Sequence, residues 1–128
     1  MQVIHTDKAP SHTGPVPQAV EAEGWILVSA LFGADAVDHV IPADARAEAE
    51  QLFTNLEAIL QAAGSRLDQV VRVGIVMRHL QRDRPAFNEV WAQRFGEHRP
   101  ARSAVETSDF GRAGESARFM IEVTALRG

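Results

Sequence analysis

The sequence has 128 residues, a length that suits one compact domain, and we expect residues 1–128 to form it. Hydrophobic residues make up 45% and charged residues 23%, which are proportions typical of globular proteins. The formal net charge is −4 and no basic run is present, so the composition argues against a nucleic-acid partner. The chain has no cysteine, which excludes disulfides, thiolate nucleophiles and cysteine-ligated metals.

The N-terminal stretch "MQVIHTDKAP" lacks the charged segment and the apolar segment of a secretory signal. No apolar run approaches the ~20 residues that a membrane-spanning helix needs. We therefore expect a cytoplasmic protein with no membrane partner.

The first part of the chain indicates strands joined by turns. The proline-rich and glycine-rich residues 14–17 predict a loop, and a short strand follows near residues 18–21. Glu23 and Gly24 are typical of a hairpin turn. The segment "WILVSALF" from Trp25 is apolar on both faces, which predicts a central strand.

The most regular pattern predicts a helix over residues 43–63. Pro42 and Asp44 suit its start, and Gly64 suits the left-handed position just past its end. Its apolar residues recur at steps of three and four: Ala49, Leu52, Phe53, Leu56, Ile59, Leu60 and Ala63.

The second half of the sequence indicates three more strands and one helix. The strands are "VVRVGIVM", "ARSAVETS" and "ARFMIEVTAL", in which apolar residues alternate with others. The helix is predicted to begin with Asp83 as its cap and Pro85 in its first turn. Trp91 lies on its apolar face, and we expect both Trp25 and Trp91 to be core residues.

The expected order is therefore β-β-β-α-β-α-β-β, which predicts an α+β fold with a mixed six-stranded sheet and two helices on one face. Several strands are apolar on both faces, although helices cover only one. We expect another subunit to cover the second face.

Arg102 and Glu122 are charged residues within strands that are otherwise small or apolar, so each needs a partner or a function. One interpretation is a structural ion pair, between these two residues or with Arg72 and Arg78. The other is an anion site, in which the planar guanidinium of Arg102 binds a substrate carboxylate through two hydrogen bonds.

Other site patterns are absent from the sequence. The histidines show no metal-ligand spacing, the glycines form no nucleotide-binding fingerprint, and Ser29 does not lie in a nucleophile elbow. We therefore expect neither a metal nor another cofactor. The five histidines are His5, His12, His39, His79 and His98.

Several stretches together resemble one known family. In order they are "GPVPQAV", "ILVSALFGAD", "NLEAILQAAG", "VVRVGIVMRHL", "FNEVWAQRF", "RPARSAVE" and "MIEVTAL". This order resembles the Rid family of reactive intermediate deaminases, also called YjgF proteins or the endoribonuclease L-PSP family. The resemblance extends from about Ala9 to Leu126.

The resemblance implies a chorismate-mutase-like fold of the bacillus type, assembled as a homotrimer with a cleft at each subunit interface. It implies an enzyme that hydrolyses enamines or imines bearing a carboxylate to a keto acid and ammonia, without a metal or a covalent nucleophile. Arg102 matches the arginine that binds the substrate carboxylate, and Glu122 matches a glutamate that orients water. Ser29 and Asn88 match two further site residues.

The sequence departs from the family pattern around the expected cleft. Val16 replaces a tyrosine that lines it, Ala30 and Leu31 replace a glycine and a glutamine, and Ala104 occupies a position often taken by cysteine. These replacements indicate a larger or less polar substrate, as in an aminomuconate-type deaminase of one particular pathway.

Two other functions remain open. One is a non-catalytic trimer of the same fold that binds a small carboxylate. The other is the ribonuclease activity attributed to some relatives, which the negative net charge disfavours.

Overall fold

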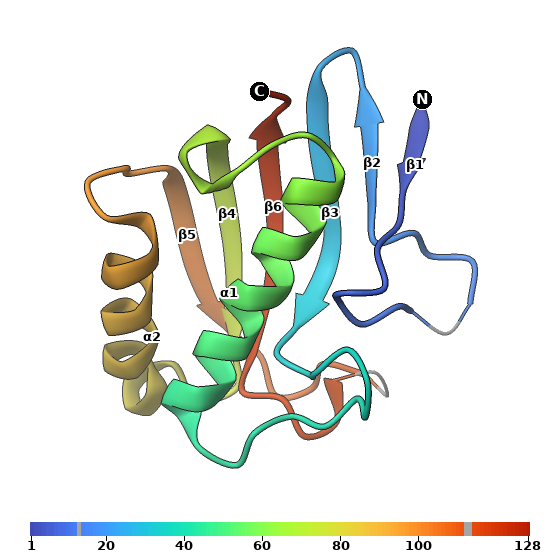
Figure 1. The fold of residues 1–128 in the computed structure, drawn as a ribbon. Helices are drawn as coiled ribbons and strands as arrows, with labels where there is room; N and C mark the ends of the chain where they lie inside the picture. Colours follow the sequence, from blue (N-terminus) through green and yellow to red (C-terminus); the bar gives the residue numbers. More distant parts are fainter. Residues whose placement is uncertain (13, 112–113) are drawn as a thin grey trace.

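The computed structural model describes residues 1–12, 14–111 and 114–128. Among these, six strands form one sheet in the order β1-β2-β3-β6-β4-β5, and only β4 and β5 are parallel neighbours (Figure 1). The elements are β1 (Gln2–Ile4), β2 (Ala19–Ala22), β3 (Trp25–Phe32), α1 (Ala45–Ala62), the short 3₁₀ helix η1 (Leu67–Gln69), β4 (Val70–Met77), α2 (Leu80–Phe95), β5 (Ala101–Glu106) and β6 (Phe119–Leu126). The mixed sheet with two helices confirms the predicted fold class.

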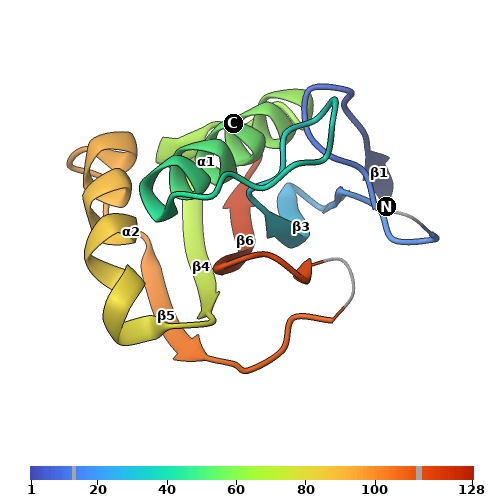
Figure 2. The ribbon, with the colours of Figure 1, turned by 90° about the horizontal axis from the view of Figure 1, so that it is seen from below.

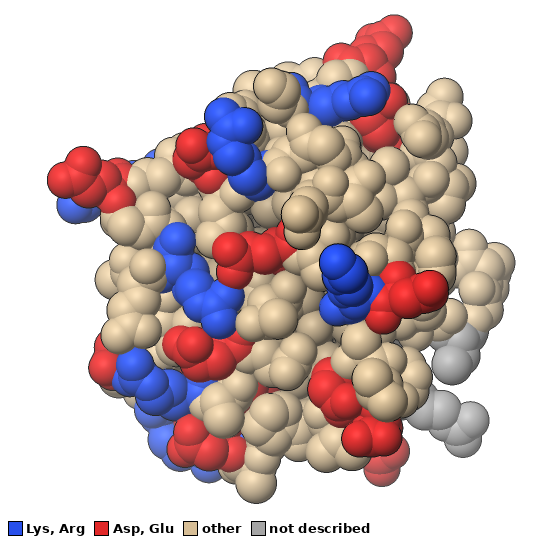
Figure 3. Space-filling view, viewed as in Figure 1, with Lys and Arg blue, Asp and Glu red and all other residues tan. Residues whose placement is uncertain are grey.

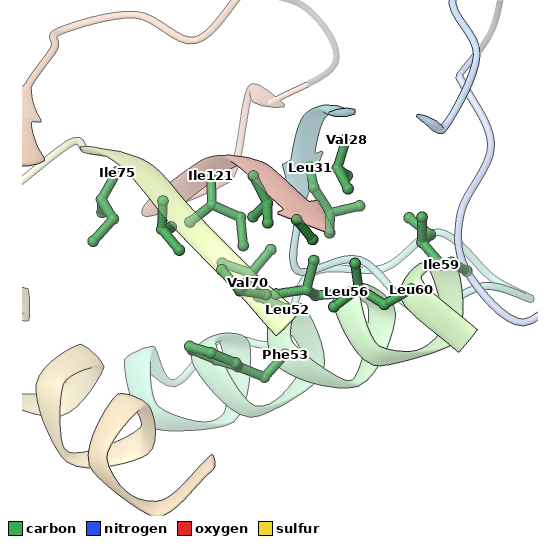
Figure 4. Close-up of a cluster of buried hydrophobic side chains, with 14 of the residues drawn as sticks. Val28, Leu31, Leu52, Phe53, Leu56, Ile59, Leu60, Val70, Ile75 and Ile121 are labelled. Atoms are coloured by element: carbon green, nitrogen blue, oxygen red, sulfur yellow. The ribbon is translucent and has the colours of Figure 1, made fainter. Parts of the chain in front are cut away.

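Both helices lie on the same face of the sheet (Figures 1 and 2). The core lies between them and the sheet, where Leu52 and Leu56 of α1 pack near Leu31 and Ile121 of the strands (Figure 4). On β6 the residues alternate between buried and more exposed positions, beginning with the fully buried Phe119. This alternation is what the sequence pattern predicted for the last strand.

Ion pairs join the two helices on their outer side. Nη1 of Arg94 on α2 lies 2.5 Å from Oε2 of Glu57, and its Nη2 lies 3.2 Å from Oε2 of Glu50. A further pair joins Arg46 to Glu89. Positive and negative side chains are accordingly interspersed on this side of the molecule (Figure 3).

The ends of α1 agree with the sequence prediction. The side chain of Asp44 accepts a hydrogen bond from the backbone N of Ala47 at 3.0 Å, which satisfies a free amide of the first turn. Gly64 has a φ of 77°, a left-handed conformation that favours glycine. Glu23 and Gly24 also form the predicted hairpin turn between β2 and β3.

The predicted start of the second helix is wrong. α2 begins at Leu80 rather than after Asp83, so Pro85 lies inside the helix instead of in its first turn. The cap comes from a distant strand, because Oε1 of Glu106 accepts a hydrogen bond from the backbone N of Leu80 at 2.9 Å. Pro85 has no N–H, so it makes no hydrogen bond to the carbonyl of Gln81 within the helix.

The face of the sheet turned away from the helices carries exposed apolar side chains, and we call it the open face. Trp25 is 44% exposed there, so the prediction that it is a core residue is wrong for the single chain. β1 also contributes to this face, and the sequence analysis had assigned no residues to that strand. The large exposed apolar residues of the open face are Val3, Trp25, Leu27, Val105 and Leu126.

No helix among the described residues combines the length and the apolar character needed to cross a membrane.

Candidate active site

Arg102 lies on the helix-covered face of β5, the strand at one edge of the sheet. Its backbone pairs with that of Val73, a buried residue of β4. The guanidinium carbon of Arg102 lies 4.6 Å from the ring centroid of Trp91 and 5.9 Å from that of Phe87, both on α2. These distances are in cation–π range, so the arginine stacks against the aromatic side of the helix.

Trp91 is held in place by other aromatic rings. Its ring centroid lies 4.5 Å from that of Phe95 and 6.2 Å from those of Phe53 and Phe87. Phe53 and Phe87 are fully buried, whereas Trp91 is only partly buried. Trp91 therefore has one side in the core and offers the guanidinium a firmly packed ring.

Arg102 has no ion-pair partner among the described residues. Burial lowers the pKa of Arg102, and the positive charge of Arg84 lowers it further, yet a guanidinium stays protonated at neutral pH. The aromatic rings of α2 thus contact the guanidinium in place of a carboxylate. The interpretation of Arg102 as half of a structural ion pair is wrong within this chain.

Glu122 lies on the opposite face of the sheet. On β6 it pairs with Gly74, the neighbour of Val73 in β4, so its side chain projects from the open face. A Cβ atom added to Gly74 would lie 3.1 Å from Cγ and 3.2 Å from Oε1 of Glu122. The side chain of Glu122 therefore lies across a gap that only glycine leaves free, and the sheet separates it from Arg102.

The other arginines proposed as ion-pair partners also have different contacts. Nη2 of Arg72 donates a hydrogen bond to Oγ of Ser103 at 3.0 Å. Arg78 donates to four backbone carbonyls, including Nε to Ala117 O at 3.0 Å and Nη1 to Ser108 O at 3.1 Å. Arg78 therefore shapes the segment before β6, a role that its position in an alternating strand did not reveal.

A β-bulge places two predicted site residues beside Glu122. Val28 pairs with Val123 and Leu31 with Ile121, so Ser29 and Ala30 together face Glu122 alone. A bulge of this kind bends the strand and redirects its side chains.

A cavity of about 490 Å³ opens next to this bulge. Val16, Ala30 and Leu31 line it. Arg102, Asn88 and Ala104 do not. The full lining is Pro10, Ser11, His12, Val16, Ala30, Leu31, Phe32, Ala34, His39, Ile41, Glu115 and Ser116.

The wall of this cavity is braced from α1. Nδ2 of Asn55 donates hydrogen bonds to Phe32 O at 3.0 Å and Ala34 O at 2.7 Å, which holds the chain as it leaves β3. Glu48 is fully buried and accepts hydrogen bonds from the backbone N of Arg118 and Phe119 at 2.8 and 3.1 Å. Sequence reasoning missed both residues, because a polar position on a helix does not show which loop it will reach.

The predicted site residues thus form two separate groups. The arginine half-site consists of Arg102, Ala104 and Asn88: Ala104 follows Arg102 on the same face of β5, and Asn88 is exposed on α2 next to Phe87. The glutamate half-site lies across the sheet, on and beside the open face, and consists of Glu122, Ser29, Ala30 and Val16. One chain does not bring the two half-sites together.

Within residues 1–12, 14–111 and 114–128, no cluster of three or more histidine or acidic side chains could hold a metal ion.

Residues 6–127 match a family model described as Endoribonuclease L-PSP. The chain belongs to this family. It is 34% identical over 128 residues to a 2-iminobutanoate/2-iminopropanoate deaminase of the goat Capra hircus, which covers 99% of this chain and 90% of the relative. It is 35% identical over 108 residues to a RutC family protein of Pyrococcus horikoshii, covering 84% of this chain and 85% of that one.

Solved structures of L-PSP family proteins have the same fold. RidA from an Antarctic Psychrobacter gives a TM-score of 0.91 at 32% identity, covering 98% of this chain and 99% of that one. TdcF from E. coli, solved with bound serine, gives 0.90 at 28% identity over the whole of both chains. The predicted membership in the Rid or YjgF family is confirmed, while the role of each site residue stays a prediction.

Proposed function

We propose that this L-PSP family chain hydrolyses 2-imino acids, and the enamines in equilibrium with them, to 2-keto acids and ammonia. One observation carries the proposal: Arg102 is cationic, stacked on Trp91 and without a carboxylate partner among the described residues. Relatives named 2-iminobutanoate/2-iminopropanoate deaminase, in mammals and in a mite, support an imine deaminase. The serine bound to TdcF supports a site for a small molecule with a carboxylate.

Arg102 anchors the substrate in this reaction. With its face against Trp91, the guanidinium keeps its N–H edge available, and that edge matches a carboxylate through two parallel hydrogen bonds. Holding the carboxylate fixes the adjacent imine carbon relative to the attacking water, which lowers the entropic part of the barrier.

Glu122 acts on the water. On the protonated imine, its carboxylate accepts a proton as the water oxygen bonds to the imine carbon, which gives a tetrahedral intermediate carrying both a hydroxyl and an amino group. Glu122 then returns this proton to the nitrogen and accepts the proton of the hydroxyl as the carbon–nitrogen bond breaks, so ammonia leaves and the keto group forms. Ser29 lies in the bulge opposite Glu122, and we assign its Oγ to bind the same water.

This chemistry requires the two half-sites to meet, and we propose that they meet between subunits of a homotrimer. The apolar side chains of the open face supply a surface that association would bury. Glu122 and the bulge lie on that face, while Arg102 lies at the edge strand β5. In the assembly, the glutamate half-site of one chain faces the arginine half-site of its neighbour.

The cavity beside the bulge gives room for a substrate longer than iminopropionate. Val16, Ala30 and Leu31 contribute to its lining, so substrates with several carbons beyond the imine are expected to be accepted. This favours imino acids larger than iminopropionate, including the substrates of a pathway-specific deaminase.

The test is a competition assay. An amino-acid oxidase generates 2-imino acids of increasing length, semicarbazide traps the imine that remains, and suppression of trapping measures hydrolysis. Arg102→Ala removes the carboxylate anchor and is expected to lower kcat/KM about 10- to 150-fold, the equivalent of about 1.5–3 kcal/mol for a charged hydrogen bond. Arg66→Ala is the control, because Arg66 is exposed and pairs with Asp68 away from both half-sites.

Undiminished hydrolysis by Arg102→Ala would refute the role of Arg102. If the wild type binds 2-keto acids in an Arg102-dependent manner but hydrolyses no imine, the chain is the non-catalytic carboxylate-binding trimer instead.

A further inference from the structure

The side of α2 that faces β5 carries a second arginine besides Arg102. Arg84, Asn88 and Trp91 follow one another at steps of four and three residues, so they share one side of α2. Arg102 stacks on this same side, over Phe87 and Trp91. The positive charge of Arg84 contributes to lowering the pKa of Arg102, which agrees with this placement.

The carboxylates near this side of α2 already form hydrogen bonds or ion pairs. Asp83 accepts two hydrogen bonds from Arg82, at 2.9 and 3.0 Å. Glu89 pairs with Arg46 on α1, and Oε1 of Glu106 accepts from the backbone N of Leu80. Neither Arg84 nor Arg102 has an ion pair among the described residues.

The spacing along α2 and β5 fits a substrate that reaches both arginines. Ala104 lies on β5 two residues beyond Arg102 and on the same face, where it packs against the core. Arg84 precedes Phe87 by three residues and Trp91 by seven, which is a rise of roughly 4.5 to 10.5 Å along the helix axis. The carboxylates of a five-carbon dicarboxylic acid are separated by about 5 Å, since its fully extended chain advances only slightly more than 1 Å per bond.

We propose that Arg84 is a specificity-determining residue that binds a second carboxylate, so that the preferred substrates are 2-imino dicarboxylates. This inference rests on the proposed function, because it assigns the substrate class of the same site. Arg102 holds the carboxylate next to the imine carbon, and Arg84 holds the carboxylate at the far end of the side chain. Two unneutralised guanidinium groups favour a dianion over a monoanion of equal length.

Arg84 contacts the substrate far from the reacting carbon. This contact therefore contributes equally to the binding of the ground state and of the transition state. Its loss is expected to raise KM for the dicarboxylate while leaving kcat nearly unchanged. The contact is exposed, so it should weaken as the salt concentration rises.

The experiment compares 2-iminoglutarate with 2-iminopentanoate, two five-carbon substrates that differ in the terminal carboxylate. In the wild type, we expect kcat/KM to be higher for 2-iminoglutarate. Arg84→Gln should lower the ratio of the two values about threefold to tenfold through KM, and Arg84→Lys should restore most of it. Arg66→Gln removes one positive charge, as Arg84→Gln does, but outside α2 and β5. It should leave the ratio unchanged.

A ratio that is the same in Arg84→Gln and in the wild type refutes the inference, while hydrolysis of 2-iminopentanoate would leave the proposed function standing. If the wild type hydrolyses no imine at all, the deaminase proposal fails, and calorimetry with glutarate and pentanoate still decides the question for Arg84. Tighter binding of glutarate that is lost in Arg84→Gln would uphold the dicarboxylate site. Equal binding of glutarate by both proteins would overturn it.

Discussion

Replacing Trp91 by leucine tests whether the aromatic face of α2 prepares Arg102 for its substrate. The guanidinium carbon lies 4.6 Å from the Trp91 centroid, and a partly buried cation–π contact contributes about 0.5–2 kcal/mol. Trp91→Leu should therefore weaken carboxylate binding roughly 2- to 30-fold. Trp91→Phe keeps an aromatic face and should show a smaller loss.

The substitution also removes contacts with Phe53, Phe87 and Phe95, so it should lower the free energy of unfolding by about 2–3 kcal/mol. Val90→Ala is the matched control, because Val90 is fully buried on the same helix without being one of the rings that hold Arg102. Calorimetric titration with a 2-keto acid and denaturant unfolding would be measured for each variant. The reasoning is refuted if Trp91→Leu binds the keto acid as tightly as the wild type, or if Val90→Ala weakens binding to the same extent.

Three further predictions follow from the open face and from α1. Leu27→Asp places a charge on the open face and should yield folded monomers by light scattering, whereas Val37→Asp, at a loop residue that is 83% exposed, should leave the assembly intact. Gly74→Ala brings a Cβ to 3.1 Å from Cγ of Glu122 and should lower kcat roughly tenfold with little change in melting temperature; an unchanged kcat would argue against Glu122 as the group that orients water. Burial raises the pKa of Glu48 above its ordinary value of 4.5, so the folded state binds more protons than the unfolded state between 4.5 and the raised pKa. The stability of the wild type relative to Glu48→Gln should therefore be greatest below pH 4.5 and fall as the pH rises through that window, and denaturant unfolding that shows the opposite slope would contradict this.

The sequence predicted those elements whose signals are local. The start of α1 depends on Asp44 and an amide three residues away, and its end depends on Gly64, so both could be read directly. The start of α2 could not, because its cap is Glu106, 26 residues beyond Leu80. Local composition favoured Asp83 instead, whose carboxylate is held by Arg82 in the structure.

The same distinction explains which strand side chains can be assigned to one face of the sheet from the sequence. Glu122 lies on a strand with buried and exposed residues in strict alternation, so its position on the face away from the core could be predicted. β5 lies at the edge of the sheet and has no fully buried residue, so its alternation does not tell from the sequence which face carries Arg102. Its pairing with Val73 and its stacking on Trp91 show that the guanidinium points toward α2 and away from Glu122.

The stacking of Arg102 on Trp91 explains how an arginine can remain in a strand without a carboxylate partner. A carboxylate would neutralise the guanidinium and occupy the N–H edge that a substrate needs, so each binding event would first have to break an ion pair. An aromatic ring interacts with the flat face of the guanidinium and leaves that edge free. The cation is thus held in position within the chain, and under the proposed function the carboxylate of the substrate supplies the opposite charge.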